Sequence, residues 1–308
     1  MGEDSESALR GIQVFLDTQA MSAAADSGLR NAAYWVALRQ EILTAFSKQR
    51  PFRLPLGPCK SYRSFEPADD YVWADRLVIH CADMLQYCFG SEDEMMSRDQ
   101  TRFSQFASAS TPDDMLLPLA TSTTVAAPDM TQAQRVARYE ELSGFDALWA
   151  ELCPASFTPI YTRDADRSRG EVFPEIWYLN NCHVAGIQHL ELSRILLAVY
   201  NPKIPRLGPG HRIAMRSVDL ELKSIVLRLC GIALSNQHCP PGLVTACVAI
   251  AMCGDRFTER EEQGALLSVL HKLEDNHAWP THNTQKLLKE AWGWADADTH
   301  DVSAIGDS

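Results

Sequence analysis

Large apolar residues recur at three- and four-residue steps along most of the chain, which is the spacing of one face of an α-helix. Between residues 27 and 48 this stripe includes Trp35, Leu38 and Ile42. It ends before Pro51, because the residue before a proline avoids helical backbone angles. Patterns typical of strands are scarce. The same spacing predicts further helices over residues 70–89, 139–152, 176–200, 213–234, 241–253, 259–276 and 284–292.

Residues at the ends of two of these segments match known helix caps. Asp69 or Asp70 can accept hydrogen bonds from the first free backbone N–H groups of the second predicted helix, and Gly90 can end that helix. Thr258, with Glu261 three residues later, has the spacing of a capping box at the start of a later helix. We therefore predict an all-α fold, a single multi-helix domain of roughly nine packed helices.

Two segments lack helical periodicity. Residues 91–132 are rich in Ser, Thr, Asp and Pro, and a structureless stretch of this length inside a compact domain is usually mobile or disordered. Residues 295–308 are acidic and polar and are expected to form a disordered tail. The predicted helical domain therefore spans residues 1–294, with residues 91–132 as a long mobile insert.

The net charge narrows the range of functions. The chain of 308 residues has 28 Lys and Arg against 40 Asp and Glu, a formal net charge of −12. Proteins that bind nucleic acid tightly need a surplus of basic side chains to displace counterions from the phosphates. We therefore expect no direct nucleic-acid binding by this chain.

The cysteines and the apolar runs are those expected of an intracellular protein that does not span a membrane. Nine cysteines, an odd number, are spread along the chain and mostly lie in apolar segments, which is typical of reduced, buried thiols in an intracellular protein. The N-terminal residues are acidic and lack the apolar core of a secretory signal. The longest apolar run, Gly242–Cys253, is shorter than the roughly 20 residues that a membrane span needs, so we expect no membrane association.

Cys182, His183 and His189 lie close together in an apolar segment and are the first candidates for a metal site. On one helix, however, the two histidines are six residues apart and point in different directions. The chain also contains no Cys-x-x-Cys and no His-Glu-x-x-His motif. These observations favour packed or hydrogen-bonded histidines over a metal site, and contact with a ligand stays open as a third possibility.

Motifs for catalysis are missing as well. The chain has no Gly-x-Ser-x-Gly elbow and no phosphate-binding glycine loop. Asp164 and Asp166 could form a carboxylate pair, but the neighbouring arginines favour a solvated, salt-bridged loop. We therefore predict that the chain is not an enzyme and needs no cofactor, while an apolar small-molecule site between helices stays open. The candidate ligand-binding residues for such a site are Trp177, His183, His189, Arg194 and Trp279.

Several segments of the chain resemble the regulatory domain of fungal zinc-cluster transcription factors. They are KQRPFRLPL (Lys48–Leu56) after an aromatic helix, the segments Phe173–Gly208 and Cys230–Thr281, and the closing LKEAWGW (Leu288–Trp294). The resemblance covers most of residues 9–294 apart from the insert. The shared motifs are structural, so they indicate a family rather than an activity.

The resemblance implies an all-helical regulatory domain in the nucleus that restrains or releases transcription on a small-molecule or partner signal. In that family, an N-terminal segment with six cysteines around two zinc ions reads DNA. The first cysteine here is Cys59, and no Cys-x-x-Cys precedes it, so the DNA-binding role is not carried over. The chain shows no clear nuclear import signal, and the cytoplasm is the alternative location.

The expected partners follow from the same resemblance. The chain is expected to begin inside the helical domain, which would leave an apolar face uncovered and favour association. We therefore expect it to bind a second copy of itself or a full-length zinc-cluster factor, and to respond to a small-molecule effector. The alternative is a small-molecule-binding helical protein or an enzyme of a fungal secondary-metabolite pathway. An enzyme would gather polar groups with shifted pKa values, such as His183, His189, Arg194 and a carboxylate, around one open cleft.

Overall fold

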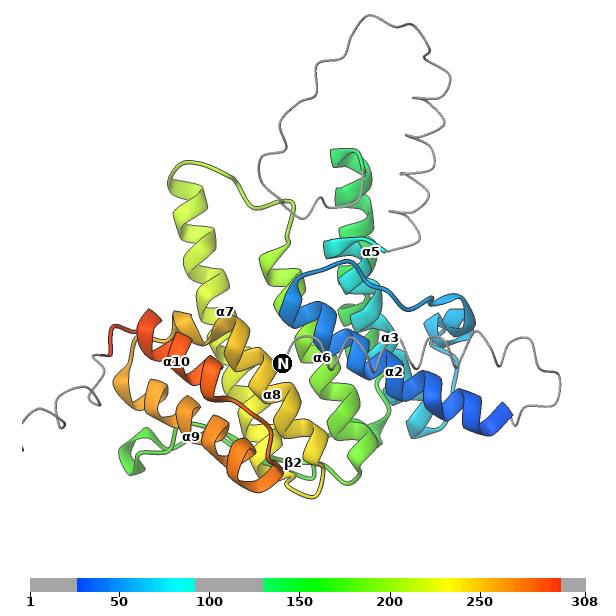
Figure 1. The fold of residues 1–308 in the computed structure, drawn as a ribbon. Coiled ribbons are helices and arrows are strands. Elements are labelled where there is room, and N and C mark those ends of the chain that lie inside the picture. The colour runs from blue at the N-terminus through cyan, green and yellow to red at the C-terminus, as the bar shows by residue number, and fades with distance from the viewer. Residues whose placement is uncertain (1–26, 92–129, 295–308) are drawn as a thin grey trace, which may run out of the picture. The chain divides into compact units, whose positions relative to one another are not determined.

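The computed structural model describes residues 27–91 and 130–294 of the chain. Helices make up most of these residues, and the fold is all-α, as predicted (Figure 1). The α-helices are α2 (Ser27–Lys48), α3 (Asp70–Phe89), α5 (Gln132–Leu152), α6 (Asn181–Val199), α7 (Pro209–Ser235), α8 (Pro240–Cys253), α9 (Arg260–His277) and α10 (His282–Ala291). The 3-10 helices are η1 (Gly57–Arg63), η2 (Ala155–Phe157), η3 (Arg167–Arg169) and η4 (Gly254–Arg256), and the strands are β1 (Tyr161–Arg163) and β2 (Glu175–Trp177).

Helices α2 and α3 have the bounds that the periodicity predicts, and both predicted caps of α3 are confirmed. Asp69 is the N-cap residue, and its Oδ1 accepts a hydrogen bond from Val72 N at 2.9 Å. Gly90 ends the helix with a φ of 83°, a backbone conformation that favours glycine. Its N–H donates to Gln86 O at 2.8 Å. The local sequence is therefore sufficient to place both ends of α3.

Helix α5 begins earlier than the periodicity indicates, at Gln132 rather than at residue 139. Thr131 and Gln134 form a capping box before it. Gln134 N donates to Thr131 Oγ1 at 3.3 Å, and Thr131 N donates to Gln134 Oε1 at 2.9 Å. The first turns of α5 carry few large apolar residues, so its start is marked by the cap and not by an apolar stripe.

The predicted insert and tail fall largely outside the described residues. Of the insert, the structure describes residue 91 and residues 130–132. Ser91 forms an isolated parallel bridge with Phe52, and residues 130–132 lead into α5. Residues 92–129, the tail over 295–308 and residues 1–26 lie outside the described part of the chain. The domain limits at residues 1 and 294 stay a prediction.

The helix predicted from residue 176 onward is wrong at its start, because β2 lies there and α6 begins only at Asn181. β2 pairs antiparallel with β1. Side chains at the end of α7 hold it in place: Ser235 Oγ accepts a hydrogen bond from Ile176 N at 3.0 Å. Asn236 Oδ1 accepts one from Tyr178 N at 3.1 Å. These long-range bonds satisfy the backbone in an extended conformation, which local periodicity does not reveal.

The capping box predicted before α9 is also wrong. Glu259, not Thr258, is the N-cap residue, and its side chain makes no capping hydrogen bond within the described structure. A buried glutamine takes over instead. Gln263 donates from its backbone N to Glu259 O at 3.0 Å and from its Nε2 to Phe257 O at 2.8 Å. The start of α9 is thus stabilised by Gln263, a residue of its own first turn.

The described residues divide into two compact units, and the division falls within α6 and α7. The first unit contains the residues up to 158 and residues 185–214, and the second contains residues 159–184 and those from 215 onward. Helices α2, α3 and α5, η1 and most of α6 therefore belong to the first unit. The hairpin of β1 and β2, most of α7, and helices α8, α9 and α10 belong to the second unit.

Helix α3 is the centre of the first unit. Fifteen of its 20 residues are buried, and α2, η1 and α5 contact it. Helix α6 also comes close, because a Cβ at Gly186 would lie only 3.0 Å from Ala74 Cα. A helix enclosed in this way must find partners for each polar side chain that it carries, since burying an unsatisfied polar group costs free energy.

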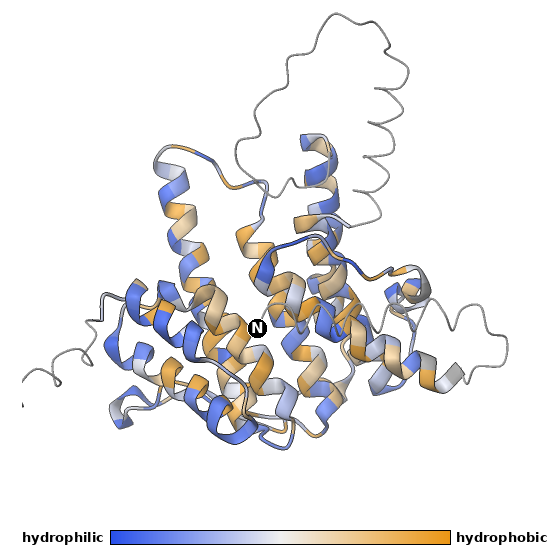
Figure 2. Cartoon of the chain, viewed as in Figure 1, coloured by the Kyte–Doolittle hydropathy of each residue, from blue (hydrophilic) through white to orange (hydrophobic). Residues whose placement is uncertain are grey.

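Helix α8 is the most apolar helix of the second unit. Figure 2 shows it mainly in the colours of hydrophobic residues, whereas α9 and α10 carry more hydrophilic positions. The segment after α10 packs onto the same unit. Trp292 Nε1 donates to Gly254 O at 2.9 Å, and Trp294 Nε1 donates to Gln263 Oε1 at 2.8 Å. The guanidinium of Arg260 lies 3.5 Å from the ring centroid of Trp294, so the last described residues are anchored.

We expect Gly231→Ala to destabilise the protein, because a Cβ at this position in α7 would overlap the carbonyl oxygen of Pro174. Overpacking typically costs about 1–3 kcal/mol, and the gain of about 1 kcal/mol in helix propensity offsets part of it. The free energy of unfolding should therefore fall by about 1 kcal/mol in urea denaturation followed by circular dichroism.

Gly264→Ala in α9 is the matched control. No atom lies within 4 Å of a Cβ built there, so this variant should be up to about 1 kcal/mol more stable than the parent protein. Equal shifts in both variants would contradict the close approach of Gly231 to Pro174.

Candidate functional site

A cavity of about 250 Å³ lies in the first unit, between α3, α5 and the segment around η1. Helix α3 contacts both α5 and η1, so three pieces of chain that are distant in sequence supply the walls. The lining residues are Tyr62, Arg63 and Phe65 from η1 and the residues after it, Arg76, Ile79, His80 and Asp83 from α3, and Arg138, Glu141, Leu142, Phe145 and Leu148 from α5.

Helix α3 supplies a polar stripe to this cavity. Arg76, His80 and Asp83 follow one another at four- and three-residue steps, so they share one face of the helix. All three residues are buried, with exposed fractions of 4%, 4% and 6%. Burying a polar group costs free energy unless the group is hydrogen-bonded or paired. Asp83 is paired, whereas Arg76 and His80 each keep a nitrogen without a partner.

The carboxylate of Asp83 is fully engaged. Arg63 donates from Nε and Nη2 to its two oxygens at 2.8 Å and 2.6 Å, a bidentate arrangement that is among the stronger ion pairs. These hydrogen bonds are the main cause that raises the pKa of Arg63 above its usual value. The pair therefore closes one wall of the cavity and joins the end of η1 to α3.

Arg76 has a different environment. Its Nη1 donates to the backbone oxygen of Glu66 at 2.7 Å, and its guanidinium carbon lies 4.3 Å from the ring centroid of Trp73, a cation–π contact. Its Nε is buried without a hydrogen-bond partner. Within the described residues, no carboxylate forms an ion pair with Arg76. A positive charge with an unsatisfied N–H group thus lines the cavity.

His80 is the second incompletely satisfied group. Its ring stacks on Phe145, with the ring centroids 3.9 Å apart and the planes inclined by 6°. Its Nε2 is buried and has no hydrogen-bond partner in the described structure. Burial lowers the pKa of His80 to about 3, with smaller contributions from the positive charges of Arg138 and Arg194. The imidazole is therefore neutral at neutral pH.

Helix α5 forms the outer wall of the cavity. Arg138 pairs with Glu141 one turn later at 2.6 Å, and Phe145 presents its ring to His80. Leu148 lines the cavity and is also 45% exposed, so it lies where the cavity meets solvent. The outer wall is thus polar at one end of α5 and apolar at the other.

Two of the five predicted ligand-binding residues, His189 and Arg194, belong to the first unit but do not line this cavity. The Nδ1 of His189 lies 2.7 Å from Ala185 O, and burial lowers its pKa to about 4. Arg194 pairs with Asp146 at 3.0 Å and with Glu191 at 2.8 Å. Both residues therefore have structural partners, although the Nε2 of His189 is buried without a hydrogen-bond partner in the described structure.

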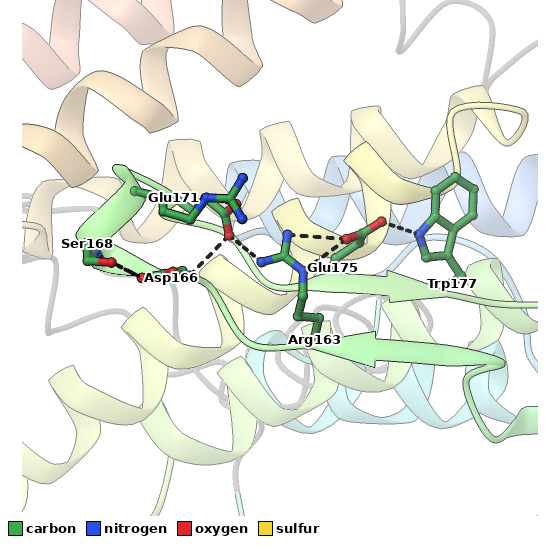
Figure 3. A network of polar contacts seen from close by, with 7 residues as sticks. Arg163, Asp166, Ser168, Glu171, Glu175 and Trp177 are labelled. Atoms are coloured by element: carbon green, nitrogen blue, oxygen red, sulfur yellow. Dashed lines mark hydrogen bonds and ion pairs between the residues drawn. The ribbon is translucent and has the colours of Figure 1, made fainter.

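The other three predicted residues, Trp177, His183 and Trp279, belong to the second unit. Trp177 is in β2, and its Nε1 donates to Glu175 Oε1 at 2.8 Å (Figure 3). His183 is buried in the first turn of α6, whereas Trp279 is 47% exposed after α9. Within the described residues these three are therefore separately placed on β2, α6 and the segment after α9.

The loop before β2 is rich in ion pairs, as predicted. Its arginines, however, pair with glutamates and not with Asp164 or Asp166. Arg163 pairs with Glu171 at 2.6 Å and with Glu175 at 3.3 Å, as Figure 3 shows. Asp166 instead accepts a hydrogen bond from Ser168 N at 3.0 Å and begins η3. We read this network as structural, because Arg163 is paired with Glu171 and Glu175 and Asp166 is hydrogen-bonded by Ser168.

The thiols are packed, as the sequence indicates. Seven of the nine cysteines are buried, and the remaining two, Cys153 and Cys182, are partly buried. Burial raises the pKa of Cys153 to about 11 and that of Cys247 to about 12, so these thiols stay protonated at neutral pH. In the described part of the chain, no three His, Cys, Asp or Glu side chains gather as a metal site would require. None of the described helices is both long and apolar enough to cross a membrane.

The residues that line the cavity were not among those predicted from the sequence, although a signal for them exists. Arg76, His80 and Asp83 share one face of a helix that is largely apolar. Such a polar stripe indicates either a buried network or a site. The contribution of α5 has no comparable signal, because its lining residues change from charged (Arg138 and Glu141) to apolar (Leu142, Phe145 and Leu148) along the helix.

Comparisons with protein-family models, with curated proteins and with solved structures found no match for this chain. The family that the sequence resembles therefore stays a prediction.

We expect the pH dependence of stability to reveal the buried neutral imidazole of His80. Its pKa is about 3 in the folded state and about 6.5 in the unfolded chain. The unfolded chain therefore binds more protons below about pH 6.5, and acidification lowers the free energy of unfolding. His80→Phe keeps an aromatic ring against Phe145 and removes this effect. Between about pH 7 and about pH 5, the free energy of unfolding of the variant should fall by about 2 kcal/mol less than that of the parent protein.

The measurement is urea denaturation at a series of pH values. Because His189 titrates in both proteins, the difference between the two curves isolates His80. Parallel curves for the two proteins would contradict the burial of His80 as a neutral group.

Proposed function

We propose that this chain is a helical regulatory module of transcription, which binds a small-molecule effector in the cavity of its first unit and passes the signal on through a protein partner. The module acts in the nucleus and does not read DNA itself. Its partner is a second copy of the chain or an intact zinc-cluster factor. Two observations support the proposal: the all-helical fold is the one that the sequence resemblance implies, and the charge of −12 disfavours direct contact with phosphates.

The observation that carries the proposal is the state of the cavity walls. Arg76 and His80 are buried on consecutive turns of α3, and each has a nitrogen without a hydrogen-bond partner. Native proteins rarely leave such groups without a partner, which can be an ordered water, an ion or a ligand. A bound ligand that completed them would be favoured over an empty cavity, and it would stabilise the contacts between α3, α5 and η1.

A second candidate function, an enzyme, has one observation in its favour. Polar groups with a shifted pKa do gather around one cavity, although they are His80 and Arg76 rather than the residues that the sequence suggested. The lining residues include no Ser, Thr, Cys or Lys, which are four of the side chains that enzymes use as nucleophiles. Asp83 is also occupied by Arg63. Binding is therefore better supported than covalent catalysis.

We expect a cavity-blocking substitution to alter transcriptional output. The chain would be fused to an unrelated DNA-binding domain, and reporter transcription would be measured in a fungal strain. The fusion should change the reporter level severalfold relative to the DNA-binding domain alone. Leu148→Trp places a bulky ring where the cavity meets solvent, so the effector can no longer enter and the fusion should stay in one state.

Leu152→Trp provides the matched control, because Leu152 lies one turn further along α5, is similarly exposed at 43%, and does not line the cavity. This variant should behave as the parent fusion does. A fusion that leaves the reporter unchanged in all three forms would refute the proposed function. Steady turnover of a small molecule by the purified protein would favour the enzyme instead.

A further inference from the structure

We infer that the ligand of this cavity is a small aromatic carboxylic acid, with its carboxylate bound by Arg76 and His80 and its ring held between the aromatic side chains of the walls. The inference rests on the proposed effector site and names the chemical class that fits it. It follows from four properties of the cavity: its charge, its unsatisfied nitrogens, the chemistry of its walls and its size.

The charge of the cavity calls for an anion. Its lining contains three arginines and two carboxylates. Arg63 is matched by Asp83, and Arg138 is matched by Glu141. Arg76 is left over as a buried cation that, within the described residues, hydrogen-bonds only to the backbone oxygen of Glu66, although the Glu66 carboxylate favours its charge without forming an ion pair with it. A guanidinium in this situation binds a carboxylate better than a neutral group, because the ion pair offsets the cost of burying the charge.

The unsatisfied nitrogens fit a carboxylate group. Arg76 Nε and His80 Nε2 are both buried without hydrogen-bond partners, and the two residues are one helical turn apart on α3. A carboxylate has two oxygens that only accept hydrogen bonds. It can accept one from the Arg76 N–H and one from His80 when the imidazole proton is on Nε2. The carboxylate of one ligand thus offers an acceptor oxygen to each of the two nitrogens.

The walls of the cavity favour a flat, apolar body for the rest of the ligand. Tyr62, Phe65 and Phe145 line it, together with the aliphatic side chains of Ile79 and Leu142. Phe65 and Phe145 already form an aromatic pair, with their ring centroids 5.0 Å apart. Aromatic side chains prefer to stack with another ring or to meet it edge-on, so an aromatic acid complements these walls better than an aliphatic one.

The size of the cavity excludes large effectors. Its volume of about 250 Å³ is below the range of about 300–1,000 Å³ that is common for drug-sized ligands. A carboxylate attached to one or two fused rings suits this space. Inorganic phosphate would also match the charge, but it would leave the apolar walls in contact with water.

Isothermal titration calorimetry with 2-naphthoate as the probe tests the inference. The parent protein should bind 2-naphthoate, whereas the neutral isostere 2-naphthamide and inorganic phosphate should bind at least about tenfold more weakly, since neither offers both the charge and the ring. Equal affinity for the acid and the amide, or tighter binding of phosphate, would overturn the inference.

Three variants locate the carboxylate. Arg76→Gln should weaken 2-naphthoate binding by about thirtyfold or more, as is typical when one member of a buried charged pair is removed. His80→Phe keeps the ring but not the nitrogen, and should weaken binding by about five- to tenfold, the worth of one hydrogen bond. Arg169→Gln is the control, because this arginine is exposed and does not line the cavity. It should change the affinity by less than about twofold.

Circular dichroism and thermal melting verify that each variant is folded. If Arg76→Gln does not fold, His80→Phe and Leu148→Trp still decide the matter, since both should weaken binding of 2-naphthoate. Unchanged affinity in a folded Arg76→Gln or His80→Phe variant would overturn the placement of the carboxylate.

The outcome also separates this inference from the proposed function. Binding of 2-naphthoate that depends on Arg76, combined with a silent reporter, would uphold the ligand class and refute the role in transcription. A reporter that responds to Leu148→Trp, combined with no binding of 2-naphthoate, would uphold the regulatory role and refute the ligand class.

Discussion

The enclosure of α3 is the constraint on which the first unit depends. Residues from Trp73 to Phe89 are almost all buried, so the polar side chains among them cannot turn to solvent. Each one needs a partner from another segment, and these partners fix where the segments lie. Arg63 reaches Asp83 from the end of η1, and Phe145 meets His80 from α5. The irregular chain around η1 and the position of α5 are therefore set by the polar face of α3 as much as by apolar packing.

Some of these buried polar groups have all their hydrogen-bond partners and others do not, and this difference separates structural from functional residues. Where two charges match, as in Arg63 with Asp83, the pair holds segments together and has little capacity left for a ligand. Where a nitrogen stays unsatisfied beside a cavity, as in Arg76 and His80, the unit keeps a cost that only a further molecule can relieve. Net charge and motif searches do not distinguish these cases, because both kinds of residue are arginine or histidine in an apolar segment.

The sequence was sufficient for most of the helices because their periodicity and caps are local, as α3 with Asp69 and Gly90 illustrates. It was insufficient for β2, whose backbone is satisfied by side chains about 60 residues later, and for the start of α5, which is marked by a capping box rather than by apolar residues. The candidate site could be predicted only in part. The polar stripe on α3 is visible in the sequence, but its pairing with η1 and α5 is a product of the tertiary fold.

The anchoring of β2 also bears on the order of folding in the second unit. Ser235 and Asn236 form hydrogen bonds with β2 and the residue after it across separations of 58 to 60 residues. Closing a loop of this length costs conformational entropy before the hydrogen bonds can stabilise the strand. Strand β2 cannot gain these partners until α7 has formed to its last turn. The hairpin should thus be a late kinetic step, slow to form and among the first parts of the unit to be lost when α7 frays.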